Sequence, residues 1–437
     1  MRIGLIAVSG VRIYNERLKR FGITLPGFVE RAQVIASMPS LGLLTLAGAT
    51  PDRHTLTYHE CPDFDPAMLD SLRVDVVAIS SFTAKADVMY RIADHLRSKG
   101  TRVVLGGLHC TLVPDEAAAH ADAIVVGEGE LAWPRLLDDL EKGRLRKVYR
   151  TAFRDVDLGA SPMPRFDLLD LDAYNRIPIQ TSRGCPLDCE FCAASKIFGG
   201  YKRKPVHRVI EEVRAAKRLW PRPFVELADD NTFVHKEWSR ALVRALAEED
   251  IHWFTETDVS VADDPELLDL LGRSGCRQVL IGFESPNAAS LDGLDPAGWK
   301  SRRHEQYLRT IDAIQSRGVS VNGCFITGLD GDTPDTFEEI ERFVRRSGLA
   351  EVQVTVMTPF PGTALHRRLK AEGRLLRDRY WEQCTLFDVA FRPKRMSVEQ
   401  LEQGLEHLMG SLYTKEETER RQRGFLQTVR GGRRRAS

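Results

Sequence analysis

The sequence lacks an excess of charge of either sign, and it has no long hydrophobic run. Lys plus Arg number 62 and Asp plus Glu number 62, so the formal net charge is zero. That balance gives no reason to expect nucleic acid as a partner. No run is long and apolar enough for a transmembrane segment. The opening MRIGLIAVSG also lacks the long apolar stretch and cleavage site of a signal peptide. We therefore expect a globular, cytoplasmic chain.

Cysteine is sparse as well, with eight in 437 residues. Three of them lie close together at Cys185, Cys189 and Cys192, and the other five are scattered. This distribution excludes the disulfide framework of small secreted domains and suits a reducing compartment. The scattered residues are Cys61, Cys110, Cys276, Cys324 and Cys384.

Residues 1–145 alternate short apolar runs with segments that have a helical period. The interiors of the runs are almost wholly apolar, which is typical of parallel strands covered on both faces. The pattern predicts an α/β fold with an open sheet of Rossmann type. One irregular insertion, Gly10–Met38, has no period and receives no prediction. The expected strands are Ile3–Val8, Leu56–Glu60, Asp75–Ser80, Val103–Leu105 and Ala123–Val126.

A second series of units follows a segment at 146–176 that we expect to be a linker, because it has few periodic apolar positions. Residues 177–372 repeat a strand-helix pattern that predicts a partial (β/α)6 barrel of TIM type, whose ligands gather at the C-terminal ends of the strands. Residues 373–437 are mostly charged, and we expect a short helical region there with a basic tail. The expected barrel strands are Ile177–Ser182, Phe224–Ala228, Trp253–Val259, Gln278–Phe283, Ser320–Ile326 and Val352–Met357.

The three clustered cysteines stand in RGCPLDCEFC at residues 183–192, directly after the first barrel strand. Thiolates are the usual ligands of iron–sulfur clusters, and three of them in one short loop can converge on a four-iron cluster. Three ligands leave one iron open to a small molecule. A zinc site would need a fourth ligand, and the nearest histidine, His207, lies beyond a helix start. A disulfide would leave one cysteine over. We therefore predict that Cys185, Cys189 and Cys192 hold a [4Fe–4S] cluster.

The loop resembles the signature of the radical S-adenosylmethionine (SAM) superfamily, C-x3-C-x-aromatic-C, with Phe191 as the aromatic residue. The resemblance covers about residues 177–372. It implies that SAM binds the open iron through its amino and carboxylate groups. One electron from the reduced cluster then cleaves SAM to methionine and a 5′-deoxyadenosyl radical, which takes a hydrogen atom from an unactivated carbon. We expect a donor such as flavodoxin or ferredoxin to supply the electron.

The same resemblance implies SAM contacts at later strand ends. Asp229 or Asp230 would take the SAM ammonium, although Asp230 could equally be a helix N-cap or turn residue. Glu256 and Glu284 would accept hydrogen bonds from the ribose hydroxyls, although carboxylates at strand ends can simply be solvated. The remaining expected contacts are Ser285 beside Glu284, and Ile326 and Gly328 on the adenine side.

Small residues end three strands of the N-terminal sheet, where they would let a large planar ligand approach the backbone. Alone, each is consistent with an ordinary turn between a strand and a helix. Together with residues 39–44 they resemble the cobalamin-binding domain that precedes the barrel in one radical SAM subgroup. This chain lacks the D-x-H-x-x-G motif that supplies a histidine to cobalt, which implies cobalt without a protein imidazole or a domain that has lost its cofactor. The expected contacts are Ser80, Ser81, Thr83, Gly106, Gly107, Gly127, Glu128, Gly129 and Glu130.

Other relatives fit less well, because methylthiotransferases and enzymes with auxiliary clusters carry further cysteine groups that this chain lacks. Within the subgroup, the runs 255–271, 323–336 and 391–396 are similar to the hopanoid methylase group, which implies an apolar or natural-product substrate. The leading prediction is cobalamin-dependent radical SAM methylation of an unactivated carbon. A non-methylating rearrangement, cyclisation or ring contraction remains an alternative, as does a non-catalytic protein that binds cobalamin or SAM. No feature identifies a catalytic acid or base.

Overall fold

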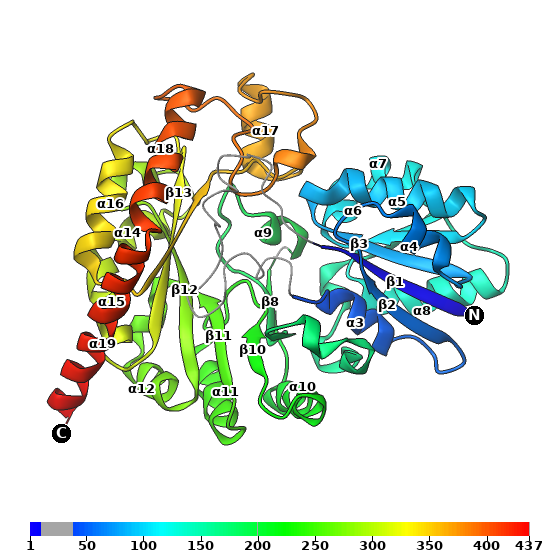
Figure 1. The fold of residues 1–437 in the computed structure, drawn as a ribbon, viewed down its shortest axis with the longest axis horizontal. Helices are drawn as coiled ribbons and strands as arrows, with labels where there is room; N and C mark the ends of the chain where they lie inside the picture. The colour runs from blue at the N-terminus through cyan, green and yellow to red at the C-terminus, as the bar shows by residue number, and fades with distance from the viewer. Residues whose placement is uncertain (10–37, 199, 437) are drawn as a thin grey trace.

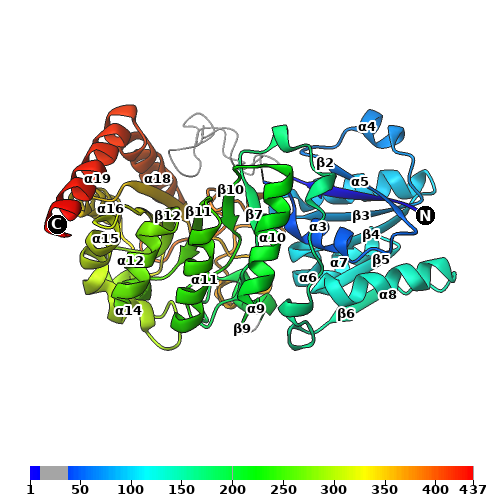
Figure 2. The same ribbon diagram turned by 90° about the horizontal axis from the view of Figure 1, so that it is seen from below.

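The computed structural model describes residues 1–9, 38–198 and 200–436, so the insertion at Gly10–Met38 lies outside the described residues except for Met38. The chain forms two lobes that lie side by side (Figure 1). The N-terminal lobe begins with β1 (Arg2–Val8), and the last helix, α19 (Lys415–Ala436), lies at the far end of the other lobe in both views (Figure 2). Within the described ranges no helix is both long and apolar enough to cross a bilayer.

The N-terminal lobe is a parallel sheet in the order β2-β1-β3-β4-β5-β6 with helices on both faces. Alternate residues of β1 enter different cores, because successive side chains of a strand point to opposite faces. Ile6 packs with helix α5 (Ala86–Ser98), whereas Leu5 packs with helices α3 (Leu41–Gly48) and α8 (Gly129–Glu141). The Rossmann-type prediction is therefore confirmed. The other elements are β2 (Thr55–Glu60), α4 (Pro66–Ser71), β3 (Val76–Ser81), β4 (Arg102–Gly106), α6 (Leu108–Leu112), α7 (Pro114–Ala119) and β5 (Ala123–Gly127).

Strand β6 (Val148–Thr151) lies in the segment that we expected to be a linker, and it pairs in parallel with β5. Only one of its four residues, Tyr149, is buried, because β6 is an edge strand. A single buried position leaves no apolar run to detect. The N-terminal sheet therefore extends past residue 145, and the chain between it and the barrel contains short 3-10 turns at 153–155, 158–160, 166–168 and 171–173.

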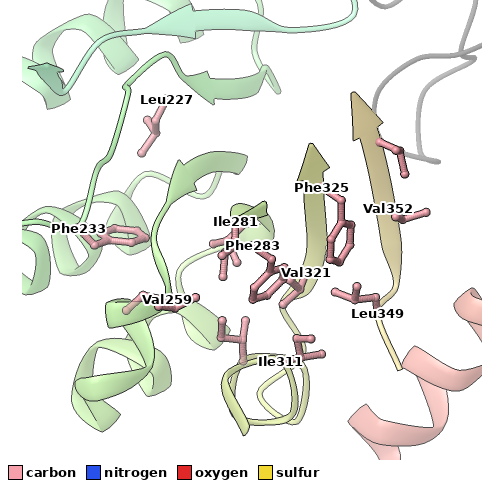
Figure 3. Close-up of a cluster of buried hydrophobic side chains, with 14 of the residues drawn as sticks. Leu227, Phe233, Val259, Ile281, Phe283, Ile311, Val321, Phe325, Leu349 and Val352 are labelled. Carbon is pink, nitrogen blue, oxygen red and sulfur yellow. The ribbon is translucent and has the colours of Figure 1, made fainter. Parts of the chain in front are cut away.

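The second lobe is the expected partial barrel, a parallel sheet in the order β14-β13-β12-β11-β10-β7. Its helices cover the outer face, where strand residues such as Phe283 and Phe325 point toward Ile311 of α15 (Figure 3). The strands are β7 (Ile177–Ile179), β10 (Phe224–Leu227), β11 (His252–Thr257), β12 (Cys276–Glu284), β13 (Ser320–Thr327) and β14 (Glu351–Val356). The helices are α10 (Val206–Leu219), α11 (Lys236–Glu248), α12 (Pro265–Arg273), α13 (Ala288–Leu291), α14 (Trp299–Arg303), α15 (Tyr307–Gln315), α16 (Thr336–Ser347) and α17 (Ala364–Ala371).

The first expected barrel strand, Ile177–Ser182, is divided in two. Strand β7 stays in the barrel beside β10, while β8 (Ser182–Gly184) turns away and pairs antiparallel with β9 (Tyr201–Arg203). The division occurs where the Asp229 carboxylate accepts hydrogen bonds from the backbone N–H groups of Thr181 and Ser182, at 2.7 and 2.8 Å. Those donors would otherwise be available to a neighbouring strand. The cysteine loop and α9 (Ala193–Phe198) connect β8 to β9.

The C-terminal region is helical only in part. Helix α18 (Val398–Leu412) packs its leucines into the barrel core, and α19 follows it. Before α18, however, the chain crosses back to the first lobe, where Tyr380, Trp381 and Cys384 belong to the core of the N-terminal sheet. The C-terminal region therefore joins the two lobes, because these side chains are buried in the first lobe and the leucines of α18 in the second.

Candidate active site

The cysteine loop lies at the barrel mouth, directly after β8. Cys189 is buried, and Cys185 and Cys192 are half-buried. Burial raises the pKa of the Cys189 thiol to about 12, with smaller contributions from Cys192 and Cys185, while Lys300 opposes the increase. No three His, Cys, Asp or Glu side chains in the described ranges are arranged to hold a single metal ion. A four-iron cluster differs from one ion because it spreads its thiolate ligands over separate irons. The donor set fits such a cluster.

Two neighbouring carboxylates at the end of β10 shape this loop. Asp229 is 5% exposed and accepts four hydrogen bonds, two on each oxygen, from Thr181, Ser182 and Thr232. The four lone-pair positions of this carboxylate are therefore occupied by the chain itself. One oxygen of Asp230 accepts from the N–H of Gly184 at 2.7 Å, and no other described side chain donates to this carboxylate. Of the two candidates for the SAM ammonium, the geometry favours Asp230.

Gly184 and Asn231 complete the support of the loop. Gly184 has φ +81°, and a Cβ there would lie 2.0 Å from the carbonyl oxygen of Gly200, so a side chain is excluded. The amide of Asn231 is 2% exposed and donates to the Sγ of Cys185 at 3.6 Å and to Asp258 at 2.7 Å. This contact with the sulfur could not be expected from local sequence, because it joins residues 46 positions apart.

Glu284 forms a buried ion pair that the sequence did not indicate. Its carboxylate accepts from Lys300 of α14 at 2.5 Å, and Lys300 also donates to the carbonyl of Gly282 at 3.1 Å. Burial opposes the charge of Lys300, but Glu284 and Cys189 raise its pKa above the usual value. Glu284 has φ +62° at an irregularity of β12, a conformation that non-glycine residues rarely adopt. The pair lies beside the cluster loop, since Lys300 acts on the Cys189 thiol.

The other residues expected at SAM lie in a turn, against the barrel core or beneath α18. Ser285 is fully buried, and its hydroxyl accepts from the backbone of Asn287, which makes it a turn residue. Phe191 and Ile326 are half-buried against the barrel core. Gly328 has φ +88°, and a Cβ there would meet Leu401 of α18 at 2.9 Å, so this glycine allows α18 to approach. Their contact with SAM stays a prediction.

A cavity of about 470 Å³, cavity A, opens between the two lobes and extends into the barrel. It is lined by Ser80 and Ser81 at the end of β3 and by barrel residues that include Glu256. The Glu256 side chain is exposed to this space. The pKa of Glu256 is raised to about 8. Burial is the largest cause, and the neighbouring carboxylates of Glu226, Asp230 and Asp229 contribute the rest. The pKa of the Glu256 carboxyl group is therefore raised above that of an ordinary glutamate.

A second cavity of about 310 Å³, cavity B, lies at the C-terminal edge of the N-terminal sheet. Leu41, Gly42, Ser80, Leu108 and Ala228 line both cavities, so the two spaces adjoin. Eight of the nine residues expected at cobalamin line one cavity or both. The exception, Thr83, is 1% exposed and begins a 3-10 turn behind the edge. The lining residues are Ser80, Ser81, Gly106, Gly107, Gly127, Glu128, Gly129 and Glu130.

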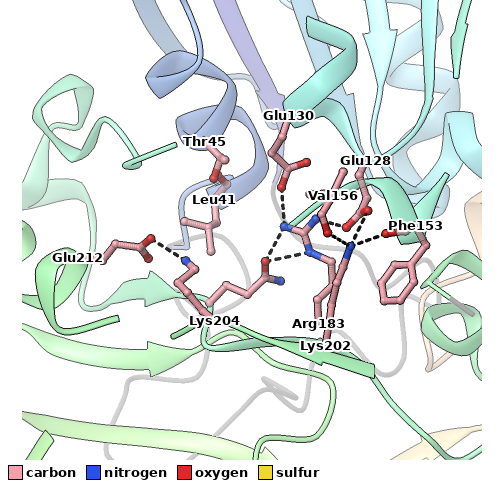
Figure 4. Close-up of polar contacts among 11 residues, drawn as sticks. Leu41, Thr45, Glu128, Glu130, Phe153, Val156, Arg183, Lys202, Lys204 and Glu212 are labelled. Carbon is pink, nitrogen blue, oxygen red and sulfur yellow. Dashed lines mark hydrogen bonds and ion pairs between the residues drawn. The ribbon is translucent and has the colours of Figure 1, made fainter. Parts of the chain in front are cut away.

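The carboxylates of Glu128 and Glu130 are already engaged by the barrel lobe (Figure 4). Arg183, two residues before Cys185, donates to both, and Lys202 donates to Glu128 at 2.9 Å. Lys202 also donates to the carbonyls of Phe153 and Val156, at 2.6 and 2.7 Å. We expected these glutamates to face the cofactor. Their carboxylates also connect the edge of cavity B to Arg183 and Lys202 of the barrel lobe, and any contact with cobalamin stays a prediction.

The comparisons with known proteins agree with this arrangement. The model of the radical SAM superfamily matches residues 179–344, that of the B12 binding domain matches residues 31–137, and a domain of unknown function, DUF4070, matches residues 363–437. The chain is 28% identical to bacteriochlorophyllide d C-12(1)-methyltransferase of Chlorobaculum tepidum, over 86% of this chain and 83% of that protein. It is 26% identical to hopanoid C-2 methylase of Rhodopseudomonas palustris, over 84% of this chain and 71% of that protein.

Among solved structures, the fold is similar to that of the radical SAM methyltransferase TsrM from Kitasatospora setae, determined with cobalamin and a [4Fe–4S] cluster bound. The TM-score is 0.67 at 15% identity, over 85% of this chain and 75% of that chain. A radical SAM domain implies a [4Fe–4S] cluster and SAM as cofactors, and a B12 binding domain implies cobalamin. The chain belongs to the radical SAM superfamily, and within it to the enzymes that carry a B12 binding domain before the barrel and are related to methyltransferases.

Proposed function

We propose that this enzyme transfers a methyl group to an unactivated carbon of a small molecule bound in cavity A. The observation that carries the proposal is the position of this cavity. Ser80 and Ser81 of the cobalamin-type sheet and Glu256 of the barrel line the same space, and cavity B continues it to Arg183 of the cluster loop. A methyl donor at the sheet edge and hydrogen abstraction at the barrel mouth would therefore act on one bound molecule.

The cofactors supply chemistry that no side chain has: the cluster with SAM supplies hydrogen-atom abstraction, and cobalamin supplies the methyl donor. The residues of the chain bind and orient them. Cys185, Cys189 and Cys192 would hold three irons, and Asp230 would take the SAM ammonium. The Glu284–Lys300 pair fixes α14 against β12 beside the loop.

The position of the cluster loop relative to the sheet edge is set by Arg183. Its contacts with Glu128 and Glu130 join the two lobes at the edge of cavity B. Apolar side chains such as Leu280, Val352 and Phe387 form other parts of the cavity A wall, where they exclude water from a reactive carbon.

One electron must reach the cluster from outside, and we propose a small carrier such as flavodoxin or ferredoxin. The five remaining cysteines support this proposal, because no short loop of the sequence contains three of them as a second cluster motif would. All eight cysteines are free thiols, which also supports a reducing, cytoplasmic setting. Replacing dithionite by purified flavodoxin with its reductase tests the carrier, and failure to support SAM cleavage would exclude it.

The test of methyl transfer uses SAM with a deuterated methyl group and anaerobically reconstituted enzyme, supplied with fractionated small molecules. A product that gains the labelled methyl group, together with equal amounts of S-adenosylhomocysteine and 5′-deoxyadenosine, supports the proposal. That stoichiometry corresponds to one SAM for the methyl group and one for hydrogen abstraction. A substrate consumed with 5′-deoxyadenosine but without S-adenosylhomocysteine would instead establish a non-methylating reaction.

A further inference from the structure

The inner face of the barrel carries polar groups beyond the cluster ligands, and one of them, Glu256, was expected at the ribose of SAM. Glu226 of β10 and Glu351 of β14 line cavity A. Three further polar side chains of the barrel strands line it as well, namely Glu256 of β11, Asn322 of β13 and Gln353 of β14. They lie on the barrel side of the cavity, away from the sheet edge at Ser80 and Ser81. We call these three side chains the polar floor.

The polar floor lacks hydrogen-bond partners within the described part of the chain. Asn322 is 1% exposed, yet its Oδ1 has no partner, and the Oε1 of Gln353 is also buried without one. The Glu256 carboxylate receives no hydrogen bond from any described residue. Folded proteins satisfy nearly all buried polar atoms, because an unmade hydrogen bond is costly in a low-dielectric interior. Two such buried atoms, beside the cavity-facing carboxylate of Glu256, indicate a ligand that provides the missing partners.

The charges around the floor favour a cation. The nearest arginine on this wall, Arg176, already donates to Glu226. Glu256 therefore faces the negative charges of Glu226 and Asp230 with no described cation paired to it. A positive group placed at Glu256 would relieve this repulsion, whereas an anion would increase it. The side-chain amides of Asn322 and Gln353 can each turn their oxygen toward the N–H donors of such a positive group.

The remaining wall of cavity A indicates an apolar body behind that polar group. Phe254, Leu280, Val352, Leu386 and Phe387 line it. Ligand sites commonly combine such apolar walls with a few polar groups that fix orientation.

We propose that the polar floor binds the substrate by a protonated amine, with Glu256 as its counter-ion and the Asn322 and Gln353 amides as further acceptors. This inference rests on cavity A being the substrate site of the proposed methylase. It narrows the apolar or natural-product substrate that the sequence led us to expect to an amphipathic amine. The ammonium end anchors the molecule deep in the barrel and directs its apolar part toward the cofactors.

The test measures binding without turnover, using three isosteric probes: 3-phenylpropylamine, 3-phenylpropan-1-ol and 3-phenylpropanoate. Each is titrated into anaerobic holoenzyme, reconstituted with cluster and cobalamin, by isothermal calorimetry near neutral pH. The amine is expected to bind at least about tenfold more tightly than the alcohol, and the carboxylate more weakly than both. Because the amine would ionise Glu256, its binding should also release protons, which appears as a dependence of the heat on the ionisation enthalpy of the buffer.

Variants locate the effect. Glu256→Gln should reduce amine affinity at least about tenfold, abolish the proton release and leave alcohol affinity unchanged. Glu248→Gln, an exposed position on the outer face of α11, is the matched control and should behave as the parent. Asn322→Leu should weaken amine binding while keeping or raising the melting temperature, because it removes an unsatisfied buried group.

Several results would overturn the inference. They are equal affinity for amine and alcohol, tighter binding of the carboxylate, or parental amine affinity in both Glu256→Gln and Asn322→Leu. Loss of cobalamin from these two variants with amine binding intact would assign the floor to the corrin amides instead. If the enzyme prefers the amine but transfers no methyl group, the proposed function is refuted and the amine site still stands. Methyl transfer without any preference for the amine would support the proposed function and refute the amine site.

Discussion

The guanidinium of Arg183 donates to the carboxylate of Glu130 at 2.7 Å and thereby attaches the cysteine loop to the other lobe. Both side chains are buried, with 10% and 8% of their surface exposed. Glu128 accepts from the same guanidinium, and the pairing raises the pKa of Arg183 against the effect of burial. Arg183 therefore connects the cluster loop to two glutamates of the cobalamin-type edge, and Lys202 supports the contact at Glu128.

Replacing this arginine should destabilise the whole molecule. Arg183→Gln leaves Glu130 buried without its cation, which costs on the order of 3–5 kcal/mol. Urea unfolding monitored by tryptophan fluorescence measures the change. Adding Glu130→Gln should recover part of the loss, because it removes the uncompensated charge. Arg317→Gln, which breaks an exposed pair with Asp269, is the control and should cost about 1 kcal/mol or less. Equal effects of Arg183→Gln and Arg317→Gln would contradict the prediction.

The cluster should depend on three cysteines and on no others. Anaerobically reconstituted protein should contain about four irons per chain. Changing Cys185, Cys189 and Cys192 together to Ala should remove the iron and all SAM cleavage, as measured by iron analysis and 5′-deoxyadenosine formation. Cys276→Ala and Cys384→Ala, at buried cysteines outside the loop, should keep the iron content. Parental 5′-deoxyadenosine formation in the triple variant would show that the cluster lies elsewhere.

Substitution of Asp230 and of Asp229 should have different effects, the first on SAM affinity and the second on thermal stability. Asp230→Asn should weaken SAM binding by about 1–3 kcal/mol, since a charge-assisted contact is lost, while the cluster remains. Asp229→Asn should instead lower the melting temperature, because an amide nitrogen cannot accept two of the four hydrogen bonds that Asp229 receives. Equilibrium dialysis with labelled SAM and thermal unfolding distinguish the two. Parental SAM affinity in Asp230→Asn would refute our choice between them.

Stability should depend on pH through Glu256. Its pKa in the folded protein is about 8, against 4.5 for an unperturbed glutamate. Between these values the folded chain holds a proton that the unfolded chain has released, so unfolding becomes easier as pH rises. The melting temperature of Glu256→Gln minus that of the parent should therefore increase from about pH 5 to about pH 8 and then level off. A difference that stays constant across this range would mean that Glu256 titrates normally.

Cobalamin binding should be blocked by bulk at Gly106. A Cβ at this position would lie 3.6 Å from Val125, an ordinary contact, so the backbone accepts a side chain whose outer atoms must fill cavity B. Gly106→Trp should lose cobalamin, seen by its absorbance after gel filtration, while its iron content is unchanged. The control is Gly410→Trp on the exposed side of α18, where nothing lies within 4 Å. Retention of cobalamin by Gly106→Trp would place the corrin elsewhere.

Local features of the sequence determined the cluster and the fold class. Cys185, Cys189 and Cys192 could be recognised because their spacing is contained in one loop, so no knowledge of distant residues was needed. The strands of both sheets could be located because buried parallel strands are apolar along their length. Where that signal is absent, prediction failed: β6 has one buried residue, and Tyr380 and Trp381 pack into a lobe more than 200 positions earlier in the chain.

The partners of the charged residues were decided only by the tertiary structure. Glu128 and Glu130, expected at the cofactor, line cavity B and also pair with Arg183. Of Asp229 and Asp230, the two candidates for SAM, Asp229 accepts hydrogen bonds from the start of β8. Lys300 gave no signal at all, although it pairs with Glu284 beside the cluster. A charged side chain can satisfy a ligand or another side chain with the same chemistry. The sequence therefore determined which groups are available, and the folded chain decided which of them remain unpaired for a ligand, because that depends on contacts between residues far apart in sequence.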